Sequence, residues 1–261
     1  MASTNGNNTL SGQVALVTGA GTGLGRASAI ALANEGAIVA ITELPDRMDR
    51  AADTVDQIEA AGSKAHALPL DVTNLSSIAE CIGQAAAIAG RIDVLVNNAG
   101  VNVPKLAMDV TEEDWDRVLD VNLKGVFFVA QAAGRIMRAQ RPQGGCIINI
   151  ASQMGLVGYW DRAAYCSSKA GVVNLTRVLA IEWAQYQIRA NAVCPTFVET
   201  PLTQPMFEKN AAFKEDVLNR ILLGRLATPE EVAATVVFLA SPGAAMVNGH
   251  ALAVDGGWTA I

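Results

Sequence analysis

The stretch VALVTGAGTGLG, residues 14–25, decides the fold of this chain. It begins with an apolar, β-branched run typical of a buried strand, and a helical pattern starts just after its last glycine. Glycines let the backbone approach a ligand closely, and the N-terminus of the following helix offers free N–H groups to a pyrophosphate. A glycine-rich turn alone is also consistent with a tight turn, but the strand–turn–helix context favours a dinucleotide-binding site. The residues predicted to hold this ligand are Gly19, Thr22, Gly23, Leu24 and Gly25.

The same alternation of short β-branched runs and helical patterns continues along the whole chain. Several of the runs are apolar throughout, as expected of strands buried on both faces of a parallel sheet. We therefore predict an α/β fold, a single-domain, doubly wound, Rossmann-like sheet of seven parallel strands with helices on both faces. The predicted strands are 14–18, 38–42, 65–70, 94–96, 146–150, 189–193 and 251–254, and the helical patterns include 27–35, 75–89, 115–139 and 163–183.

Two helix starts carry capping signals. Thr111 is followed three residues later by Asp114, and Thr228 stands before Pro229 and Glu231. An N-cap hydroxyl and an acid three residues further on can satisfy free N–H groups of the first turn, and proline fits the first helical position. Helices are therefore predicted to begin after Thr111 and after Thr228.

Two segments stand outside the regular alternation. Residues 1–10 are rich in Asn, Ser, Thr and Gly and are predicted to be a flexible tail, which leaves residues 11–261 as one domain. Between residues 195 and 223, Pro201 and Pro205 precede a short amphipathic stretch at 207–222. Because this insertion follows the carboxyl end of a strand, where ligands bind in such sheets, we interpret it as a lid.

Charge and cysteine usage exclude some partners. The net charge of −6, with no run of basic residues, argues against nucleic acid, because phosphate backbones are bound by clustered Lys and Arg. The four cysteines have no CxxC spacing and only two histidines accompany them, so no metal site is predicted. Reduced thiols are typical of a cytoplasmic protein.

No segment is typical of a signal peptide or a membrane span. Residues 1–11 lack both a basic and an apolar region. The uncharged stretch 232–254 is interrupted by Pro242, Gly243 and His250, so we interpret it as a helix, a turn and a buried strand. We expect a cytoplasmic protein with no membrane partner.

Glu43 indicates which dinucleotide is bound. It stands at the end of the second predicted strand, about twenty residues beyond the glycine turn. A carboxylate there can accept hydrogen bonds from the adenosine ribose and would repel a 2′-phosphate, which favours NAD over NADP. Arg26 and Arg47 lie nearby in sequence and leave NADP open, and a solvated loop acid is the alternative interpretation of Glu43.

Tyr165 and Lys169 form a candidate catalytic pair. They are four residues apart within a predicted helix and so share one of its faces. A nearby cation lowers the pKa of a phenol from about 10 toward working pH, which makes it a usable acid/base. Tyr and Lys are common on helices, so this pair indicates a catalytic site only in combination with the other motifs of the chain.

The motifs of this chain, taken together, resemble those of the short-chain dehydrogenase/reductase family. They occur in the family's order, and the resemblance runs from about Leu10 to the C-terminus. The motif residues are the turn 18–25, Asp71-Val72, Asn97-Asn98-Ala99-Gly100, Asn122, Ser152, Tyr165, Lys169 and the segments 188–193 and 254–257.

This resemblance implies a role for each catalytic residue. Tyr165 would exchange a proton with the substrate oxygen, and Ser152 would hydrogen-bond and orient that oxygen. Lys169 would hold the nicotinamide ribose and lower the pKa of Tyr165. Asn122 would hold a water that links Lys169 to solvent.

Further residues would contact the cofactor or border the site. By the resemblance, Asn98, Ala99 and Gly100 line the cofactor groove, Asp71 and Val72 flank the adenine, and Pro195, Val198 and Thr200 contact the nicotinamide end. Thr196 departs from the pattern, because the family often has glycine after this proline. Asp161 and Arg162, near the mouth of the site, are expected to be solvated or interfacial, and Cys166 to be structural.

The implied function is an NAD-dependent dehydrogenase/reductase that interconverts a secondary alcohol, or a hemiacetal, and a carbonyl on a small polar substrate. The segment AIEWA, residues 180–184, resembles gluconate-type dehydrogenases. The lid's Gln204, Glu208, Lys209 and Asn210 suit hydroxyl groups, so a sugar, sugar acid or polyol is expected. A 3-oxoacyl-thioester reductase is the alternative within the family. The intact catalytic set disfavours a non-catalytic NAD-binding regulatory protein, and the chain length disfavours an epimerase or dehydratase.

A homotetramer is also expected. Apolar residues at 126–129 and at Val172, Val173 and Leu175 spread around two long predicted helices, and surplus apolar helix surface usually marks an interface. The resemblance implies four subunits, with residues 255–261 near a neighbouring one.

Overall fold

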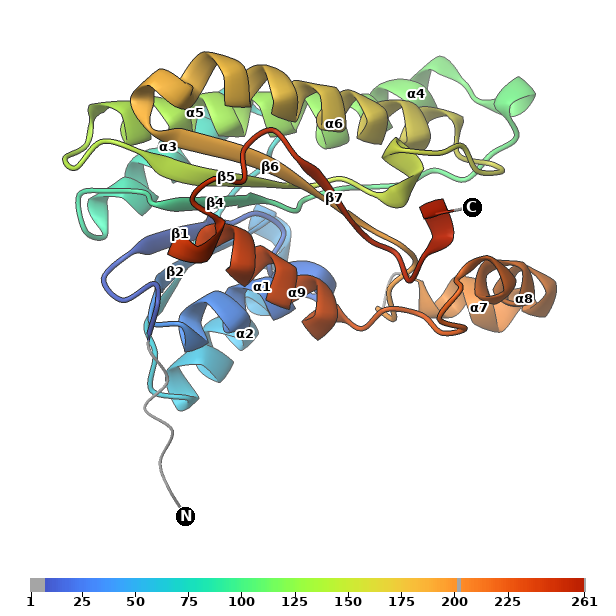
Figure 1. Cartoon of the computed structure of the whole chain (residues 1–261), viewed down its shortest axis with the longest axis horizontal. Helices are drawn as coiled ribbons and strands as arrows, with labels where there is room; N and C mark the ends of the chain where they lie inside the picture. The colour runs from blue at the N-terminus through green and yellow to red at the C-terminus, as the bar shows by residue number, and fades with distance from the viewer. Residues whose placement is uncertain (1–7, 201–202, 261) are drawn as a thin grey trace.

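Seven parallel strands form one sheet in the order β3-β2-β1-β4-β5-β6-β7 (Figure 1). The computed structural model describes residues 8–200 and 203–260. Strand β1 lies between β2 and β4, so the chain builds one edge of the sheet, returns to the middle and then builds the other edge. Connections leave β1 and β4 in opposite directions, which opens a crevice at the carboxyl ends where doubly wound sheets bind ligands. The strands are β1 Val14–Val17, β2 Ile38–Glu43, β3 Ala65–Pro69, β4 Val94–Asn97, β5 Gly145–Ile150, β6 Ile188–Pro195 and β7 Ala251–Val254.

Helices cover both faces of the sheet (Figure 1). Helices α1, α2 and α9 pack on one face and α3, α5 and α6 on the other, each set over its own apolar core. Alternate residues of β1 supply the two cores, because Ala15 and Val17 point to one face and Leu16 to the other. The helices are α1 Gly23–Asn34, α2 Met48–Ala60, α3 Leu75–Ala87, α4 Glu112–Leu119, α5 Val126–Ala139, α6 Ala163–Trp183, α7 Gln204–Lys209, α8 Ala211–Arg220 and α9 Pro229–Ala240.

The predicted strands and helix starts are confirmed. Each of the seven strands is present, and no end differs from its prediction by more than two residues. The Thr111 hydroxyl accepts from the backbone N–H of Asp114, whose carboxylate bonds back to the N-cap, and Thr228 and Glu231 form the same reciprocal pair. Helix α2 is not among the helical patterns named above, because its inward face includes the polar Thr54.

The predicted helix 115–139 is wrong as a continuous α-helix. Between α4 and α5 the backbone widens into a π-helical turn at Asp120–Gly125, which contains Asn122. Gly125 allows the loop after β3 to pack here, since a Cβ at this position would lie 2.9 Å from the carbonyl oxygen of Val72. Apolar residues continue at helical spacing on both sides of this turn, so hydrophobic periodicity does not reveal it. Such turns are frequent at functional sites.

Two predicted boundaries need correction. Leu10 is fully buried and donates its N–H to the Glu35 carbonyl at 2.9 Å, so packing extends into the predicted tail; residues 1–7 lie outside the described residues. The amphipathic stretch at 207–222 is two helices, because the side chain of Asn210 accepts from Phe213 N at 3.0 Å and starts α8 anew. Pro201 lies outside the described residues.

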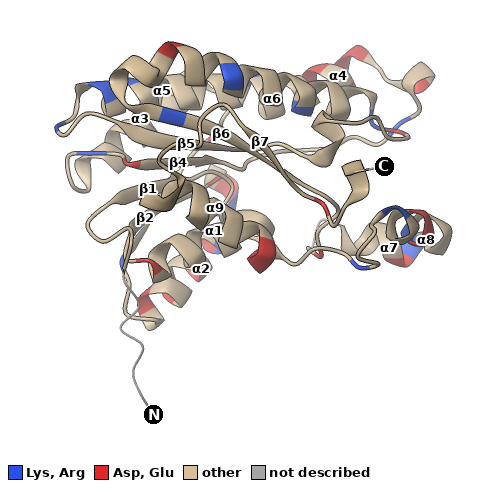
Figure 2. Ribbon diagram, viewed as in Figure 1, with Lys and Arg blue, Asp and Glu red and all other residues tan. Residues whose placement is uncertain are grey.

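Charged residues lie mainly on helices and loops, with both signs interspersed (Figure 2). Among the described residues, no helix has the length and apolar character needed to cross a membrane, and no group of three or more His, Cys, Asp or Glu gathers as a metal site would require. The stretch 232–254 comprises most of α9, a turn and β7, as predicted.

The apolar residues proposed as interface surface are mostly packed within the subunit. Val126, Val129, Val172 and Val173 are buried, because α5 and α6 each turn more than one face toward neighbouring elements. The apolar side chains left exposed on helices α4, α6 and α9 and on the turn after α9 are different ones, namely Trp115, Val178, Ile181, Phe238 and Met246.

Candidate active site

The glycine turn lies at the carboxyl end of β1, at the start of α1. Gly19 and Gly23 have φ of +61° and +56°, a region that side chains disfavour. A Cβ at Gly25 would lie 2.3 Å from the Gly19 carbonyl, so the turn can close this tightly only with glycine there. The N-cap Thr22 makes no side-chain capping bond and the first turn of α1 holds no acid. The free N–H groups therefore suit a pyrophosphate.

Asn98 braces this turn from β4. Its amide nitrogen donates to the carbonyls of Thr18 at 2.9 Å and Gly19 at 3.0 Å. The Thr18 hydroxyl in turn accepts from the backbone N–H groups of Asn98 and Ala99, both at 2.9 Å. The side chain of Asn98 thus holds the turn in shape, and Ala99 packs beside Gly19.

Thr200 reaches the same turn from the other half of the sheet. Its methyl group lies 3.6 Å from where a Cβ of Gly23 would stand. Pro195 ends β6, and Val198 is held by a bridge to Ala227. These residues therefore border the crevice on the side opposite Asn98, and the groove between them runs along the carboxyl edge of the sheet.

Glu43 lies against the glycine turn, as its predicted role requires. A Cβ at Gly21 would be 2.7 Å from Glu43 Oε2, and the other carboxylate oxygen accepts from Leu44 N at 3.0 Å. Oε2 is thus held where the ribose of a bound dinucleotide would pass. A nicotinamide dinucleotide therefore fits this groove by its glycine cradle, its open helix N-terminus and its carboxylate.

The arginines near Glu43 differ in their availability to a 2′-phosphate. Arg26 is bonded to Gly21 O, Thr54 Oγ1 and Arg50 O, which commits its guanidinium to the protein. Arg47 is exposed beside Asp46. Arg50, which the sequence analysis does not name, brings its Cβ within 2.8 Å of a Cβ at Gly21. Arg50 is therefore a further arginine that starts beside the glycine turn.

Asp71 and Val72 follow β3 at the same edge of the sheet. Asp71 Oδ1 accepts from the N–H and the hydroxyl of Thr73, at 2.9 and 2.7 Å, which fixes a tight turn there. Val72 packs against Gly125 of the π-helical turn. Both residues are half-buried beside the crevice, where the resemblance puts the adenine.

The side chain of Asn122 is fully buried and bonded within the protein. Its oxygen accepts from Val101 N at 2.8 Å, and its nitrogen donates to Val101 O at 2.9 Å and to Ser168 Oγ at 3.2 Å. These bonds tie the π-helical turn to the loop after Gly100 and to α6. The amide of Asn122 is thus engaged in joining three elements of the site.

Ser152 and Tyr165 come together at the end of β5 and the start of α6. Burial raises the pKa of the Tyr165 phenol above that of an ordinary tyrosine, and the hydrogen bond from Ser152 and the positive charge of Arg162 offset only part of this rise. The Ser152 hydroxyl also accepts from Met154 N at 3.1 Å, which fixes its position. A substrate oxygen can therefore meet two hydroxyls at once.

Lys169 is buried below this pair. Its ammonium donates to the Ile150 carbonyl at 2.7 Å and lies 5.7 Å from the centre of the Tyr165 ring. Burial lowers the pKa of Lys169 to about 8, against the opposite influence of Cys194. The positive charge that lowers the pKa of Tyr165 is that of Arg162, which the sequence analysis did not foresee, and not that of Lys169, which was expected to have this effect. A Cβ at Gly100 would lie 3.3 Å from Asn122 Oδ1 and 3.7 Å from the Lys169 ammonium, so Gly100 packs closely beside both side chains.

Of the two predicted environments, solvated or interfacial, the first is wrong for Arg162, because its side chain is only 5% exposed. It packs at the N-terminus of α6, and its backbone forms a bridge with Lys105. Its neighbour Asp161 is exposed and has a φ of +56°. The strained turn at Asp161 directs the following side chain inward.

An aromatic cluster covers the approach to Tyr165. Ring pairs with centroids 5.5–6.2 Å apart connect the loop before α6, the end of β6, the lid helices and the C-terminal segment. Tyr165 and Cys166 pack against this cluster. Although only 5% of the chain is aromatic, much of that content gathers here. The rings are Tyr159, Phe197, Phe207, Phe213 and Trp258.

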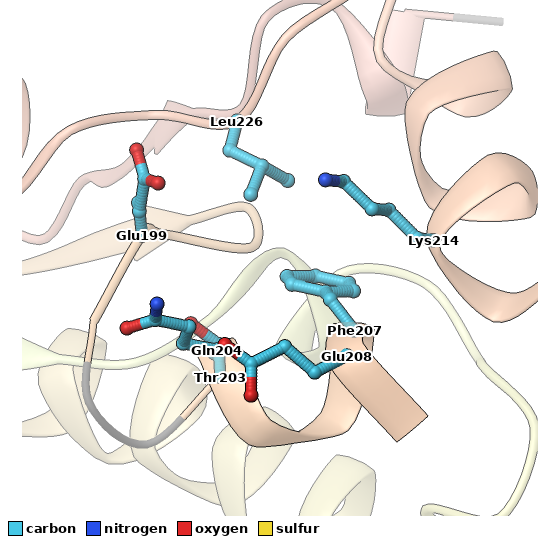
Figure 3. A pocket seen from close by; sticks show the side chains of 7 residues that line it. All are labelled: Glu199, Thr203, Gln204, Phe207, Glu208, Lys214 and Leu226. Carbon is cyan, nitrogen blue, oxygen red and sulfur yellow. The ribbon is translucent and has the colours of Figure 1, made fainter. Parts of the chain in front are cut away.

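A separate cavity of about 180 Å³ lies between the lid and the loop after β6 (Figure 3). Gln204 and Glu208 line it, as do Glu199 and Lys214, and Lys214 reaches from α8 toward Leu226. Lys209 is not among its lining residues, and Asn210 is engaged in capping α8. Two of the four lid residues proposed for a polar substrate therefore face a cavity. Ser152 and Tyr165 are not among its lining residues.

Unpaired polar atoms mark further residues that sequence reasoning missed. Gln153, next to Ser152, is 1% exposed, yet neither amide atom has a partner among the described residues. The side-chain oxygens of Asn102 and Thr196 are also buried and unpaired there. Buried polar groups normally have partners, so unpaired ones indicate where a ligand can bond. Only its position next to Ser152 could have singled out Gln153.

Comparison with known proteins agrees with this geometry. The family model described as enoyl-(acyl carrier protein) reductase matches residues 19–259. The chain is 42% identical over 249 residues to a 3-oxoacyl-[acyl-carrier-protein] reductase of Thermotoga maritima, covering 95% of this chain and 98% of the relative. It is 39% identical over 247 residues to an NAD-dependent glycerol dehydrogenase of Listeria innocua, covering 95% and 94%.

A solved structure extends the comparison to the whole fold. A protein of Agrobacterium tumefaciens, described as a 2-deoxy-D-gluconate 3-dehydrogenase with bound NADP, superposes with a TM-score of 0.88 at 38% identity, covering 98% of this chain and 100% of that one. The chain therefore belongs to the short-chain dehydrogenase/reductase family and is an oxidoreductase that acts on CH–OH groups.

Proposed function

We propose that this protein is an NAD(H)-dependent dehydrogenase that interconverts a secondary alcohol, or a hemiacetal, and a carbonyl on a small polar substrate: a sugar, a sugar acid or a polyol. The observation that carries this proposal is the grouping of Tyr165, Ser152 and Lys169 at the carboxyl edge of the sheet. In this group a phenol is set beside one hydroxyl and above a buried ammonium. Such a phenol can exchange a proton with an alcohol oxygen.

Each residue of the group has a distinct task in this proposal. Tyr165, as its phenolate, takes the proton of the substrate hydroxyl, and Ser152 donates a hydrogen bond that orients the same oxygen. A nicotinamide cofactor held in the groove would supply the acceptor for the hydride of the substrate carbon. Lys169 holds the ribose hydroxyls of the cofactor. Asn122 acts as a positioning residue, because its amide joins Val101 to Ser168.

We infer that NAD is the preferred cofactor. Support comes from Glu43 Oε2, which is held against Gly21 and would repel a 2′-phosphate. The Arg26 guanidinium is hydrogen-bonded within the protein, so it is not available to pair with that phosphate. Arg50 is the residue that favours the alternative, and the relative from Agrobacterium tumefaciens holds NADP.

Unpaired polar atoms support a hydroxylated substrate. Gln153 and Asn102 carry buried amide atoms that have no partner among the described residues. Each amide can bond to a hydroxyl group. The 3-oxoacyl-thioester reductase activity of the Thermotoga maritima relative is the second candidate, and the aromatic cluster around Phe197 favours it because that wall also suits an acyl chain.

We also propose a single dinucleotide-binding domain that begins at Leu10 and extends to residue 261, with its lid around residues 195–223, assembled as a homotetramer. The proposed compartment is the cytoplasm, where nicotinamide cofactors and reduced thiols are maintained. The exposed apolar residues Ile181, on α6, and Met246, after α9, support subunit contacts on two different sides of the chain.

A substrate panel tests the proposal. Sugars, sugar acids, polyols and cyclic alcohols are incubated with NAD and with NADP, and formation of the reduced cofactor is followed. A 3-oxoacyl thioester is tested in the reducing direction. We expect oxidation of at least one hydroxylated substrate with NAD. Reduction of the thioester alone, with no alcohol oxidised, would replace the proposal with its alternative.

A further inference from the structure

Arg162 is a buried cation without an anionic partner. Its side chain is 5% exposed, and it forms no salt bridge with any residue in ranges 8–200 and 203–260. Burying a guanidinium without a counter-charge is costly. A ligand that completes the ion pair would offset this cost.

The guanidinium has one bond within the described residues. Its Nη1 donates to the Asp161 carbonyl at 3.0 Å, and that carbonyl also accepts from Lys105 N at 3.2 Å. The bridge between Lys105 and Arg162 holds the backbone at this point. Arg162 is therefore fixed by its main chain and by one of its three nitrogens.

The bond through Nη1 leaves one edge of the guanidinium, Nε and Nη2, without a partner in the same described ranges. Arg91 uses that edge to grip the carboxylate of Asp93, with Nε at 2.9 and 2.8 Å from the two oxygens. A planar fork of this kind matches the two oxygens of a carboxylate. The free edge of Arg162 is thus suited to a carboxylate ligand.

Nearby acids do not fill this role. Asp161 is exposed and makes no salt bridge with Arg162 among the described residues. Asp216 of the lid accepts from the Tyr159 phenol and pairs with Arg220. Both carboxylates are therefore turned to solvent or engaged elsewhere.

Arg162 lies close to the catalytic residues along the chain, three residues before Tyr165. Arg162 caps α6 one turn before Tyr165, and its charge is close enough to lower the pKa of the phenols of Tyr165 and Tyr159. An anion bound there would have its neighbouring carbons near the oxygen that Tyr165 and Ser152 receive. A substrate whose carboxylate is close to its reacting alcohol satisfies this arrangement.

We propose that Arg162 is the anion-binding residue of the substrate site and that the substrate carries a carboxylate. The inference rests on the proposed dehydrogenase function and narrows it to sugar acids and related hydroxy acids. Neutral polyols would then be poor substrates, because they leave the buried guanidinium unpaired. Discrimination against a substrate that lacks the bonded group is large when the protein group is buried.

The test compares substrates that differ only in the carboxylate. Gluconate and glucitol, and further acid/polyol pairs from the panel, are assayed with NAD on the wild type, Arg162→Met and Arg162→Lys. We expect the wild type to prefer one of the acids, and Arg162→Met to lower its kcat/KM by about a hundredfold or more. The kcat/KM of the matched polyol should fall much less, because the polyol loses only the effect of the Arg162 charge on the Tyr165 phenol. Arg162→Lys should recover only part of the loss, because it keeps the charge but not the fork.

Arg189→Met is the matched control. Arg189 is a half-buried arginine whose Nη1 and Nη2 donate to the Val247 and Leu239 carbonyls, at 3.2 and 2.7 Å. It lies at the start of β6, at the opposite end of the sheet from Tyr165. Its replacement should change acid and polyol kinetics equally.

A measurement on the wild type alone covers the case in which Arg162→Met does not fold. Small carboxylates that lack an oxidisable alcohol, such as acetate and malonate, should compete with a neutral substrate, whereas chloride at equal ionic strength should not. The inference is overturned if the wild type oxidises acid and polyol equally well, if Arg162→Met impairs both alike, or if carboxylates do not compete. Absence of any NAD-dependent oxidation would instead contradict the proposed function.

Discussion

The phenol of Tyr159 donates a 2.7 Å hydrogen bond to Oδ2 of Asp216, which joins the loop before α6 to lid helix α8. Arg220 lies over the rings of Tyr159 and Trp258, with its Cζ 5.8 Å from each centroid, and pairs with the same Asp216. One hydrogen bond and a cluster of rings therefore hold α8 against the loop that precedes α6.

Tyr159→Phe should loosen the lid, because it removes the hydroxyl and keeps the ring. We expect faster hydrogen exchange for amides of residues 211–220, by about three- to tenfold, which corresponds to the net worth of one hydrogen bond. Glu215→Gln is the control, since Glu215 is an exposed neighbour of Asp216. Equal exchange in wild type and Tyr159→Phe would show that the rings alone hold the lid.

Cofactor preference should depend on Glu43. Glu43→Ala should weaken NAD modestly and improve NADP, so that the ratio of kcat/KM for the two cofactors moves toward NADP by about a hundredfold, the effect of a close like-charge contact. The double variant Glu43→Ala/Arg50→Ala should regain less NADP activity, because Arg50 is the nearby cation. A wild type that prefers NADP, or a ratio that Glu43→Ala leaves unchanged, would show that Glu43 is only a loop acid.

Lys169 should make the stability of the cofactor-free protein depend on pH. Its pKa is about 8 in the folded protein, below the 10.5 of an ordinary lysine, so between these values the unfolded chain binds more protons. The free energy of unfolding of the wild type should therefore rise across this window relative to Lys169→Met, by up to about 3 kcal/mol. Chemical denaturation at pH 7, 8.5 and 10 measures the difference. A constant difference would contradict the burial of a charged Lys169.

Subunit assembly should depend on Ile181. This side chain is 78% exposed on α6, where Val178 is its exposed neighbour one turn earlier. Ile181→Asp should split the proposed tetramer, because a carboxylate would be buried at a contact between apolar surfaces. Light scattering at micromolar concentration gives the mass, with Lys124→Asp as the surface control. If the wild type is a stable, active monomer, the homotetramer is wrong.

The sheet and the cofactor groove follow from local patterns that the sequence displays directly. Buried parallel strands are apolar along their whole length, and the turn 18–25 has few functional explanations once a strand precedes it and a helix follows. The capping pairs at Thr111 and Thr228 depend on contacts between residues three apart, which spacing alone reveals.

Features set by contacts distant in sequence could not be predicted. The π-helical turn at Asp120–Gly125 depends on Val72, which lies in another loop, and nothing in the local pattern marks it. Arg162 follows an aspartate in a polar loop and so suggests a solvated residue, yet the turn at Asp161 and the bridge to Lys105 bury it. Whether Arg26 and Arg50 are free to contact a 2′-phosphate near Glu43 likewise depends on how α1 and α2 pack together.

Turnover of Tyr165→Phe tests the central claim most directly. This variant keeps the ring and its packing and removes only the proton-exchanging hydroxyl. Formation of NADH from the best panel substrate should fall by about a thousandfold, within the range of general acid/base catalysis, while the Kd for NAD stays within about threefold of the wild type. Turnover close to that of the wild type would contradict the account, because Tyr165 could then not be the catalytic acid/base.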